Sequence, residues 1–113
     1  MSYVIGGACV DVHDMSCVEE CPVDAIYRGD RKLYIQPDEC IDCGLCQSAC
    51  PVGAISDAHA VPDQDLPHVA DARRFFYEPL PGRAEPLGSP EGAQHTGPAG
   101  VDTALVTVLP PNA

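Results

Sequence analysis

Basic residues are scarce in this sequence, which has 6 Lys plus Arg against 17 Asp plus Glu and a formal net charge of −11. A surface with so few cations repels nucleic acid and anionic membranes, so binding to either is excluded. The same charge favours partners that carry a basic docking patch, although acidity can also serve solubility alone.

Long apolar segments are also missing. No run approaches the roughly 18 apolar residues that a membrane-spanning helix needs. The first residues, 1–7, contain neither the basic region nor the apolar region of a secretory signal. Seven cysteines are an odd number, which suits complete disulfide pairing poorly. We therefore expect a cytoplasmic protein in a reducing compartment.

The chain divides into three parts by composition. Residues 1–57 contain all the cysteines and form the predicted domain. Residues 58–78 are predicted to form a linker and a surface helix over Pro67–Tyr77, since Pro67 suits a first helical turn. Residues 79–113 are rich in Pro and Gly and are predicted to form an extended tail. The apolar run Val101–Leu109 in the tail either pairs as an edge strand or docks on the domain.

The domain contains an internal repeat. Cys17-x3-Cys21-Pro-Val-Asp-Ala-Ile matches Cys46-x3-Cys50-Pro-Val-Gly-Ala-Ile, at an offset of 46 − 17 = 29 residues. In each copy a proline ends a short helical turn, and a strand follows. The expected turns are Met15–Glu20 and Gly44–Ala49, and the expected strands are Tyr3–Ile5, Asp24–Tyr27, Lys32–Ile35 and Ala54–Ser56. The second and third strands form a predicted hairpin, so the fold class is a small α+β domain with pseudo-twofold symmetry.

The cysteine spacing indicates two iron–sulfur clusters. From Cys40 to Pro51 it reads C-x2-C-x2-C-x3-C-P, the bacterial run in which three thiolates bind one cubane and the fourth cysteine binds the other cluster. The predicted [4Fe–4S] ligands are Cys21, Cys40, Cys43 and Cys46. The predicted [3Fe–4S] ligands are Cys9, Cys17 and Cys50.

The first copy lacks one thiol. Seven residues separate Cys9 from Cys17, whereas five separate Cys40 from Cys46, so the first loop is two residues longer. The missing position is Val12 when counted forward from Cys9, and Asp14 when counted backward from Cys17. Val12 at the open corner leaves a [3Fe–4S] cluster, which we favour. Asp14 or Asp11 at that corner would hold a fourth iron and give an eight-iron form.

Zinc is the competing interpretation of the paired cysteines. A structural zinc site needs four ligands, and seven cysteines do not divide into such sites without histidine. The four histidines are scattered along the chain and have no ligand spacing to a cysteine pair. The same argument excludes a Rieske centre, which needs two histidines.

Large apolar side chains are too few in residues 1–57 to form a core unaided. We expect them to pack around the two clusters, and we expect the cluster-free chain to be largely unfolded. This set comprises Val4, Ile5, Val10, Val23, Ile26, Leu33, Ile35, Ile41, Leu45, Val52 and Ile55.

These motifs resemble those of seven-iron dicluster bacterial ferredoxins of the actinobacterial, mycobacterial type. The residues that carry the resemblance are Tyr3–Gly6, Cys9–Val12, Ser16–Cys17, Glu20–Asp24, Ile26–Tyr27, Leu33–Ile35, Pro37–Cys40, Asp42–Gly44, Cys46 and Ala49–Pro51. Parts of the tail resemble the extended tail of the same proteins. One departure is Ala25, where relatives often have a cysteine that is not a cluster ligand, so the ligand set is unaffected.

The resemblance implies a pseudo-twofold dicluster ferredoxin fold and electron transfer at low potential. It implies a monomeric one-electron carrier between a ferredoxin reductase or other oxidoreductase and acceptors such as cytochromes P450. The motifs contain no nucleophile and no acid–base pair, so we do not expect an enzyme. An alternative is a bound electron-transfer subunit of a larger redox complex. An iron–sulfur redox sensor is less favoured, because no DNA-binding or effector element accompanies the clusters.

Overall fold

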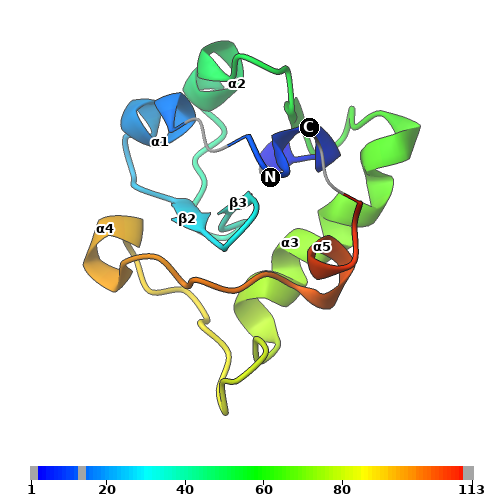
Figure 1. Ribbon diagram of the computed structural model, residues 1–113. Helices are drawn as coiled ribbons and strands as arrows, with labels where there is room; N and C mark the ends of the chain where they lie inside the picture. The colour runs from blue at the N-terminus through cyan, green and yellow to red at the C-terminus, as the bar shows by residue number, and fades with distance from the viewer. Residues whose placement is uncertain (1–2, 13–14, 111–113) are drawn as a thin grey trace.

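The computed structural model describes residues 3–12 and 15–110. In this part of the chain, short helices surround two antiparallel sheets of two strands each (Figure 1). One sheet pairs β1 (Tyr3–Ile5) with β4 (Ile55–Asp57). The other is the predicted hairpin, in which β2 (Ile26–Arg28) pairs with β3 (Leu33–Ile35). The expected mixed α+β architecture is confirmed.

The two copies of the repeat have matching helices. α1 (Ser16–Glu20) and α2 (Leu45–Ala49) lie side by side (Figure 1). Each ends at a cysteine with extended backbone, Cys21 at φ −77° and ψ 112° and Cys50 at φ −73° and ψ 117°. A proline follows each cysteine and disfavours the helical conformation there. The predicted turns are therefore correct to within one residue.

A third helix, α3 (Leu66–Tyr77), follows a 3-10 turn, η2 (Asp63–Asp65), and matches the helix predicted from Pro67. Its aromatic residues pack on the hairpin. Phe75 stacks on Tyr34 with ring centroids 3.8 Å apart, and Phe76 meets Tyr27 edge-on at 5.0 Å. Such aromatic pairs add to the free energy of burial, so the helix is fixed against the sheet.

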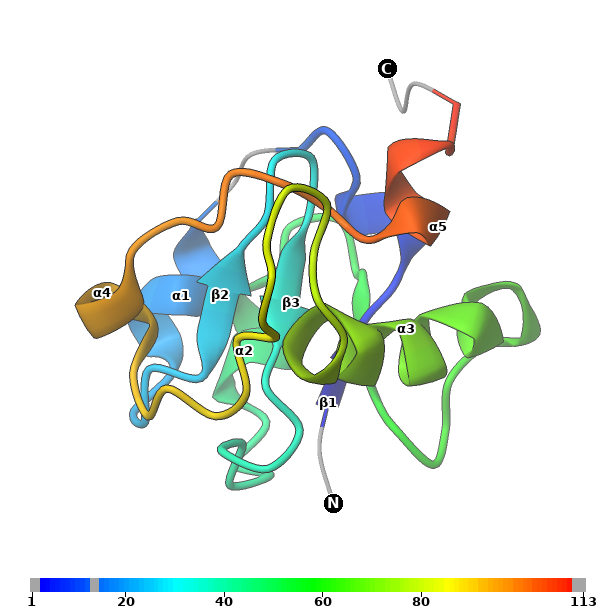
Figure 2. The same ribbon diagram turned by 90° about the horizontal axis from the view of Figure 1, so that it is seen from below.

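The tail crosses the hairpin and folds into two helical turns, α4 (Ala93–Thr96) and α5 (Ala104–Thr107) (Figure 2). Two backbone hydrogen bonds, both of 2.8 Å, join the tail to β2 and to the residues just before it. The Ala99 amide donates to the Arg28 carbonyl in β2, and the Ala93 amide donates to the Asp24 carbonyl before β2. The apolar run 101–109 docks through a helical turn, so the edge-strand alternative is wrong.

Two apolar cores result. The first lies between the sheets and the two repeat helices and consists of Ile5, Cys9, Cys17, Ile26, Leu33, Ile35, Cys46, Ala54 and Ile55. The second lies between the hairpin, α3 and the tail and consists of Val10, Tyr27, Tyr34, Phe75, Phe76, Leu80 and Val106. Cysteines contribute to the first core, whereas the second is built from aromatic and aliphatic side chains.

Among residues 3–12 and 15–110, no helix has the length and apolar character that crossing a membrane requires.

Candidate metal centre

Three cysteines from distant parts of the sequence line one cavity beside the first core. Cys9 ends the 3-10 turn η1 (Gly7–Cys9), Cys17 lies in α1, and Cys50 follows α2. Val12 lines the same cavity, and the remaining lining residues are Ile5, Leu33, Pro51, Val52 and Ile55. The structure therefore brings the predicted [3Fe–4S] ligands together in an apolar enclosure.

The other four cysteines form a second group. The electrostatic neighbours of the buried Cys46 thiol are Cys40, Cys21 and Cys43, in decreasing order of strength. Burial is the main cause that raises the pKa of Cys46 to about 11, and these neighbours add to it. Cys43 is exposed, whereas Cys21 and Cys40 are half-buried. This grouping is the one that the predicted [4Fe–4S] ligand set requires.

Thiol ionisation is costly in the first cavity. Burial raises the pKa of Cys17 to about 12, and the nearby Cys9 and Cys50 raise it further. Burial also raises the pKa of Cys9, while a backbone hydrogen bond from Leu33 and the charge of Lys32 oppose the increase. Since thiolates are the metal ligands, loading these thiols with metal must release protons.

In each half of the repeat, one backbone amide donates a hydrogen bond to a cysteine sulfur. The Ala25 amide donates to Cys21 Sγ at 3.3 Å, and the Ala54 amide donates to Cys50 Sγ at 3.4 Å. Each bond closes a turn whose fourth residue has a positive φ, Asp24 at 54° and Gly53 at 63°. The two cysteines that reach across to the opposite group are therefore held in the same way.

Val12 occupies the position in the first loop that Cys43 occupies in the second. Asp11 has a φ of 66° and Asp42 a φ of 60°, an uncommon conformation for non-glycine residues, and both stand two residues after a cysteine. The residue that follows is Val12 in one loop and Cys43 in the other. Val12 is one of the residues considered for the corner of the first cluster that lacks a thiol, and it lines the cavity that contains Cys9, Cys17 and Cys50. Asp14 lies outside the described residues.

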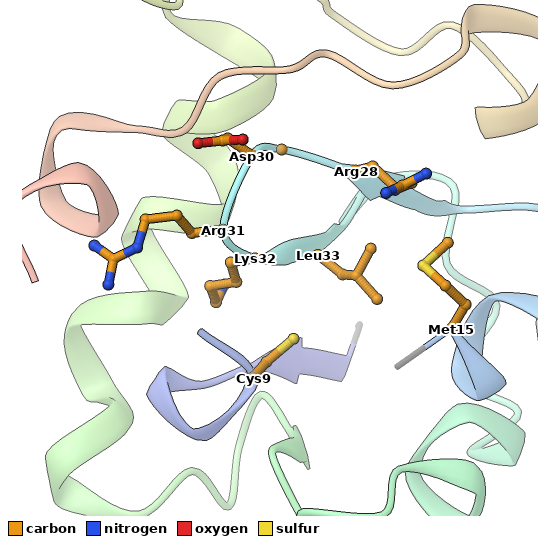
Figure 3. Close-up of a pocket in the computed structure, with 8 residues that line it drawn as sticks. Cys9, Met15, Arg28, Asp30, Arg31, Lys32 and Leu33 are labelled. Carbon is orange, nitrogen blue, oxygen red and sulfur yellow. The ribbon is translucent and has the colours of Figure 1, made fainter. Parts of the chain in front are cut away.

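Asp11, the second carboxylate considered for that corner, binds elsewhere. Its two oxygens accept hydrogen bonds from Arg31 Nε and Nη2, both at 2.9 Å. Figure 3 shows Arg31 extending away from Cys9, whereas Leu33 of the same hairpin faces it. The carboxylate therefore pairs with a guanidinium rather than facing the three thiols.

A buried cation lies near Cys9. Lys32 is only 4% exposed, and its ammonium stands 4.3 Å from the centre of the Tyr34 ring. Burial lowers its pKa to about 8, although the charges of Cys9, Asp71 and Asp102 oppose this decrease. A buried ammonium, donated amides and three thiols suit an anionic iron–sulfur group, so the residues present fit such a cofactor.

Sequence reasoning did not single out Arg31, which lies between the two strands of the predicted hairpin, or Lys32, which begins the predicted strand Lys32–Ile35. Three apolar residues that were expected to pack around the clusters lie at the surface instead, because Val23, Ile41 and Leu45 are exposed by 36%, 57% and 48%. Val52 is 43% exposed but lines the cavity of the first cysteine group.

Among the described residues, no group of three His, Cys, Asp or Glu is arranged to hold a single metal ion.

Comparison with known proteins decides the family. Residues 33–56 match the family model described as a 4Fe-4S binding domain. A ferredoxin of Mycobacterium tuberculosis is 58% identical over 110 residues, which is 97% of this chain and 96% of that protein. The chain belongs to the ferredoxins. A ferredoxin of Saccharopolyspora erythraea is 49% identical over 98% of this chain and 97% of its own length.

A "Ferredoxin 7Fe" of Hydrogenibacillus schlegelii is 47% identical over 76 residues, 67% of this chain and 97% of that protein. Ferredoxins are iron–sulfur electron carriers, and the homologues are carriers rather than enzymes. The two groups of cysteines in this ferredoxin are therefore the candidate iron–sulfur sites. The assignment of individual cysteines to each cluster stays a prediction.

Proposed function

We propose that this ferredoxin carries one [3Fe–4S] cluster on Cys9, Cys17 and Cys50 and one [4Fe–4S] cluster on Cys21, Cys40, Cys43 and Cys46. The observation that carries the proposal is the cavity lined by three cysteines and Val12. Val12 offers no donor atom at the position equivalent to Cys43, so three protein ligands suit a core that lacks one iron. The relative named "Ferredoxin 7Fe", which aligns with 67% of this chain, supports the same composition.

The protein's contribution is to hold the two cysteine groups in place and to shield them from water. A bound iron–sulfur cluster supplies one-electron redox chemistry. Leu33, Ile5 and Ile55 keep water from the first group. The Ala25 and Ala54 amides donate to sulfur, and Lys32 places a buried positive charge nearby. Hydrogen bonds, burial and charge are the factors that set the potential of such a site.

The loop 40–46 is the proposed exit for electrons. Cys43 is exposed there, between Ile41 and Leu45, which are themselves about half exposed. Asp42 is exposed on the same loop, and the whole chain has a net charge of −11. This combination suits a partner with an apolar contact surrounded by basic residues, such as a ferredoxin reductase, a cytochrome P450 or another oxidoreductase. We propose a diffusible, monomeric cytoplasmic carrier.

Iron analysis with electron paramagnetic resonance tests the cluster composition. Anaerobically purified protein is assayed for iron and sulfide before and after ferrous iron is added. About seven irons per chain and a signal from an odd-electron cluster in the oxidised state are expected. About eight irons and a silent oxidised state would overturn the proposal and indicate the eight-iron form.

A further inference from the structure

Arg31 joins three segments of the chain at the edge of the first site. Its side chain is 19% exposed, and it projects from the hairpin turn between β2 and β3. Nε and Nη2 donate to the two oxygens of Asp11. Nη1 donates to the carbonyls of Val106 and Leu109, both at 2.8 Å, and Nη2 also reaches the Pro110 carbonyl at 3.1 Å. The guanidinium is thereby oriented by the tail on one side and holds Asp11 on the other.

The backbone of Asp11 is bound to the same residue. Its amide donates to the Arg31 carbonyl at 2.7 Å, and the next amide, that of Val12, donates to the Cys9 carbonyl at 3.0 Å. With these bonds in place, the loop turns the Asp11 side chain toward Arg31 and Val12 toward the three thiols. The backbone thus fixes the loop, and the Arg31 guanidinium holds the Asp11 carboxylate on the side away from the cavity.

Asp11 is two residues from Cys9 and adjacent to Val12, both of which line that cavity. Carboxylate oxygen is a ligand for iron, and three thiolates leave a four-iron core one ligand short. A carboxylate whose two oxygens are both taken by a guanidinium has little capacity left for a metal, because bidentate pairs of this kind are among the strongest in proteins.

We propose that Arg31 is a positioning residue that keeps the first cluster at three irons by withholding Asp11 from it. The proposal rests on the three-iron composition proposed above. Without the guanidinium, a bound three-iron core in its one-electron-reduced state would accept one ferrous ion, and Asp11 would be the residue that supplies the fourth protein ligand. Electrons balance, because the reductant supplies one electron to the core and the added iron enters as Fe²⁺.

The test compares iron uptake by four full-length proteins: wild type, Arg31→Gln, Asp11→Asn and the double variant. Each is reduced with dithionite, incubated anaerobically with ferrous iron, desalted and reoxidised. Arg31→Gln is expected to gain about one iron per chain and to lose most of the oxidised-state signal of the odd-electron cluster. Wild type, Asp11→Asn and the double variant are expected to keep about seven irons and that signal.

This design distinguishes the loss of the Arg31–Asp11 ion pair from the release of the Asp11 carboxylate as an iron ligand. Arg31→Gln and Asp11→Asn break the same ion pair, but only Arg31→Gln keeps the Asp11 carboxylate. Arg83→Gln is a matched control, because Arg83 also donates to a tail carbonyl, that of Ala99 at 2.9 Å, away from Asp11. If Arg31→Gln does not assemble, Arg31→Lys replaces it. A lysine ammonium cannot form the two parallel bonds, so iron uptake is again expected.

Three results would overturn the proposal: no iron uptake by the Arg31 variant, uptake by the double variant, or equal uptake by Asp11→Asn. A seven-iron wild type that itself takes up the additional iron also contradicts the role of Arg31, whereas a wild type that contains about eight irons as purified contradicts the three-iron composition instead. The failure of the two proposals can therefore be told apart.

Discussion

At the scale of single residues, Asp102 determines the shape of the hairpin turn. It is 4% exposed, and Oδ1 accepts from the Tyr34 hydroxyl at 2.9 Å and from the Asp30 amide at 3.2 Å. Oδ2 accepts from the Arg31 amide at 2.8 Å. The turn fits so closely that a Cβ at Gly29 would clash with Asp102 Oδ1. The turn closes with its own bond from the Gly29 amide to the Lys32 carbonyl at 2.9 Å, and its two other amides donate to a residue far along the chain.

Asp102→Asn is expected to destabilise the protein by about 1–3 kcal/mol, because an asparagine amide group must face a backbone or hydroxyl donor at one of its two positions. Thermal unfolding of the iron-loaded protein, followed by circular dichroism, measures the change. Asp63→Asn removes the same formal charge from an exposed position and is expected to leave the midpoint nearly unchanged. Equal shifts in the two variants would contradict the role of Asp102.

The cysteines were predictable from the sequence because their spacing reflects the geometry of a cluster loop, and Val12 followed from counting forward from Cys9. Arg31, Lys32 and Asp102 were not predictable. Their roles depend on contacts with residues up to about 80 positions away, as in the bond between Arg31 and Pro110. Nothing in the local sequence distinguishes these three from ordinary charged surface residues.

At the scale of elements, the strands and the two repeat helices carry local signals. Alternating β-branched and aromatic residues predict the hairpin, and a proline after each cysteine predicts the helix ends. α5 is different, because the β-branched residues of 101–109 suit a strand equally well. The Thr103 side chain favours the helical turn over a strand, because its Oγ1 accepts a hydrogen bond from the Val106 amide at 3.3 Å and donates one to Asp71 at 2.6 Å. Packing of Val106 in the second core completes the helical turn.

Val106→Ala is expected to cost about 2 kcal/mol, since two buried methyl groups are lost and a small cavity remains. Val108→Ala is the matched control, because Val108 is 77% exposed on the adjoining turn. The midpoint of thermal unfolding should fall for the first variant and stay within error for the second. A similar fall in both variants would show that α5 is not anchored through the second core.

At the scale of the whole molecule, the two cores differ in their dependence on metal. Three cysteines are buried in the first core, whereas the second contains paired aromatic rings and aliphatic side chains. Reasoning from residues 1–57 alone predicted a largely unfolded cluster-free chain, because the sequence does not reveal that α3 and the tail form a second core on the hairpin. That expectation stays a prediction, and the second core gives α3 and the hairpin packing that does not involve cysteine.

After chelation of the iron, we expect hydrogen exchange to accelerate strongly in α1 and in residues 40–50, where cysteines supply the packing. The amides of Tyr34 in β3 and of α3 around Phe75 and Phe76 should keep measurable protection, because these rings pack on one another and not on sulfur. Mass spectrometry of proteolytic fragments from the holoprotein and the chelated protein gives the comparison. Uniform loss of protection would restore the expectation drawn from the sequence.

The net charge of −11 predicts that electron transfer to a reductase with a basic surface slows as ionic strength rises. Screening shortens the Debye length to about 8 Å at 0.15 M salt, so long-range attraction fades. Stopped-flow measurement of the second-order rate over a salt series tests this, with an uncharged small oxidant as control. A rate to the protein partner that does not respond to salt would contradict docking through the acidic surface.

The position of the tail in the chain has a consequence for biosynthesis. All seven cysteines precede residue 51, whereas Asp102 and Val106, which close the hairpin and the second core, come near the end. During translation the cysteine loops therefore leave the ribosome well before the residues that orient Arg31. This order of synthesis would allow iron and sulfide to reach the first loop before the tail carbonyls orient Arg31.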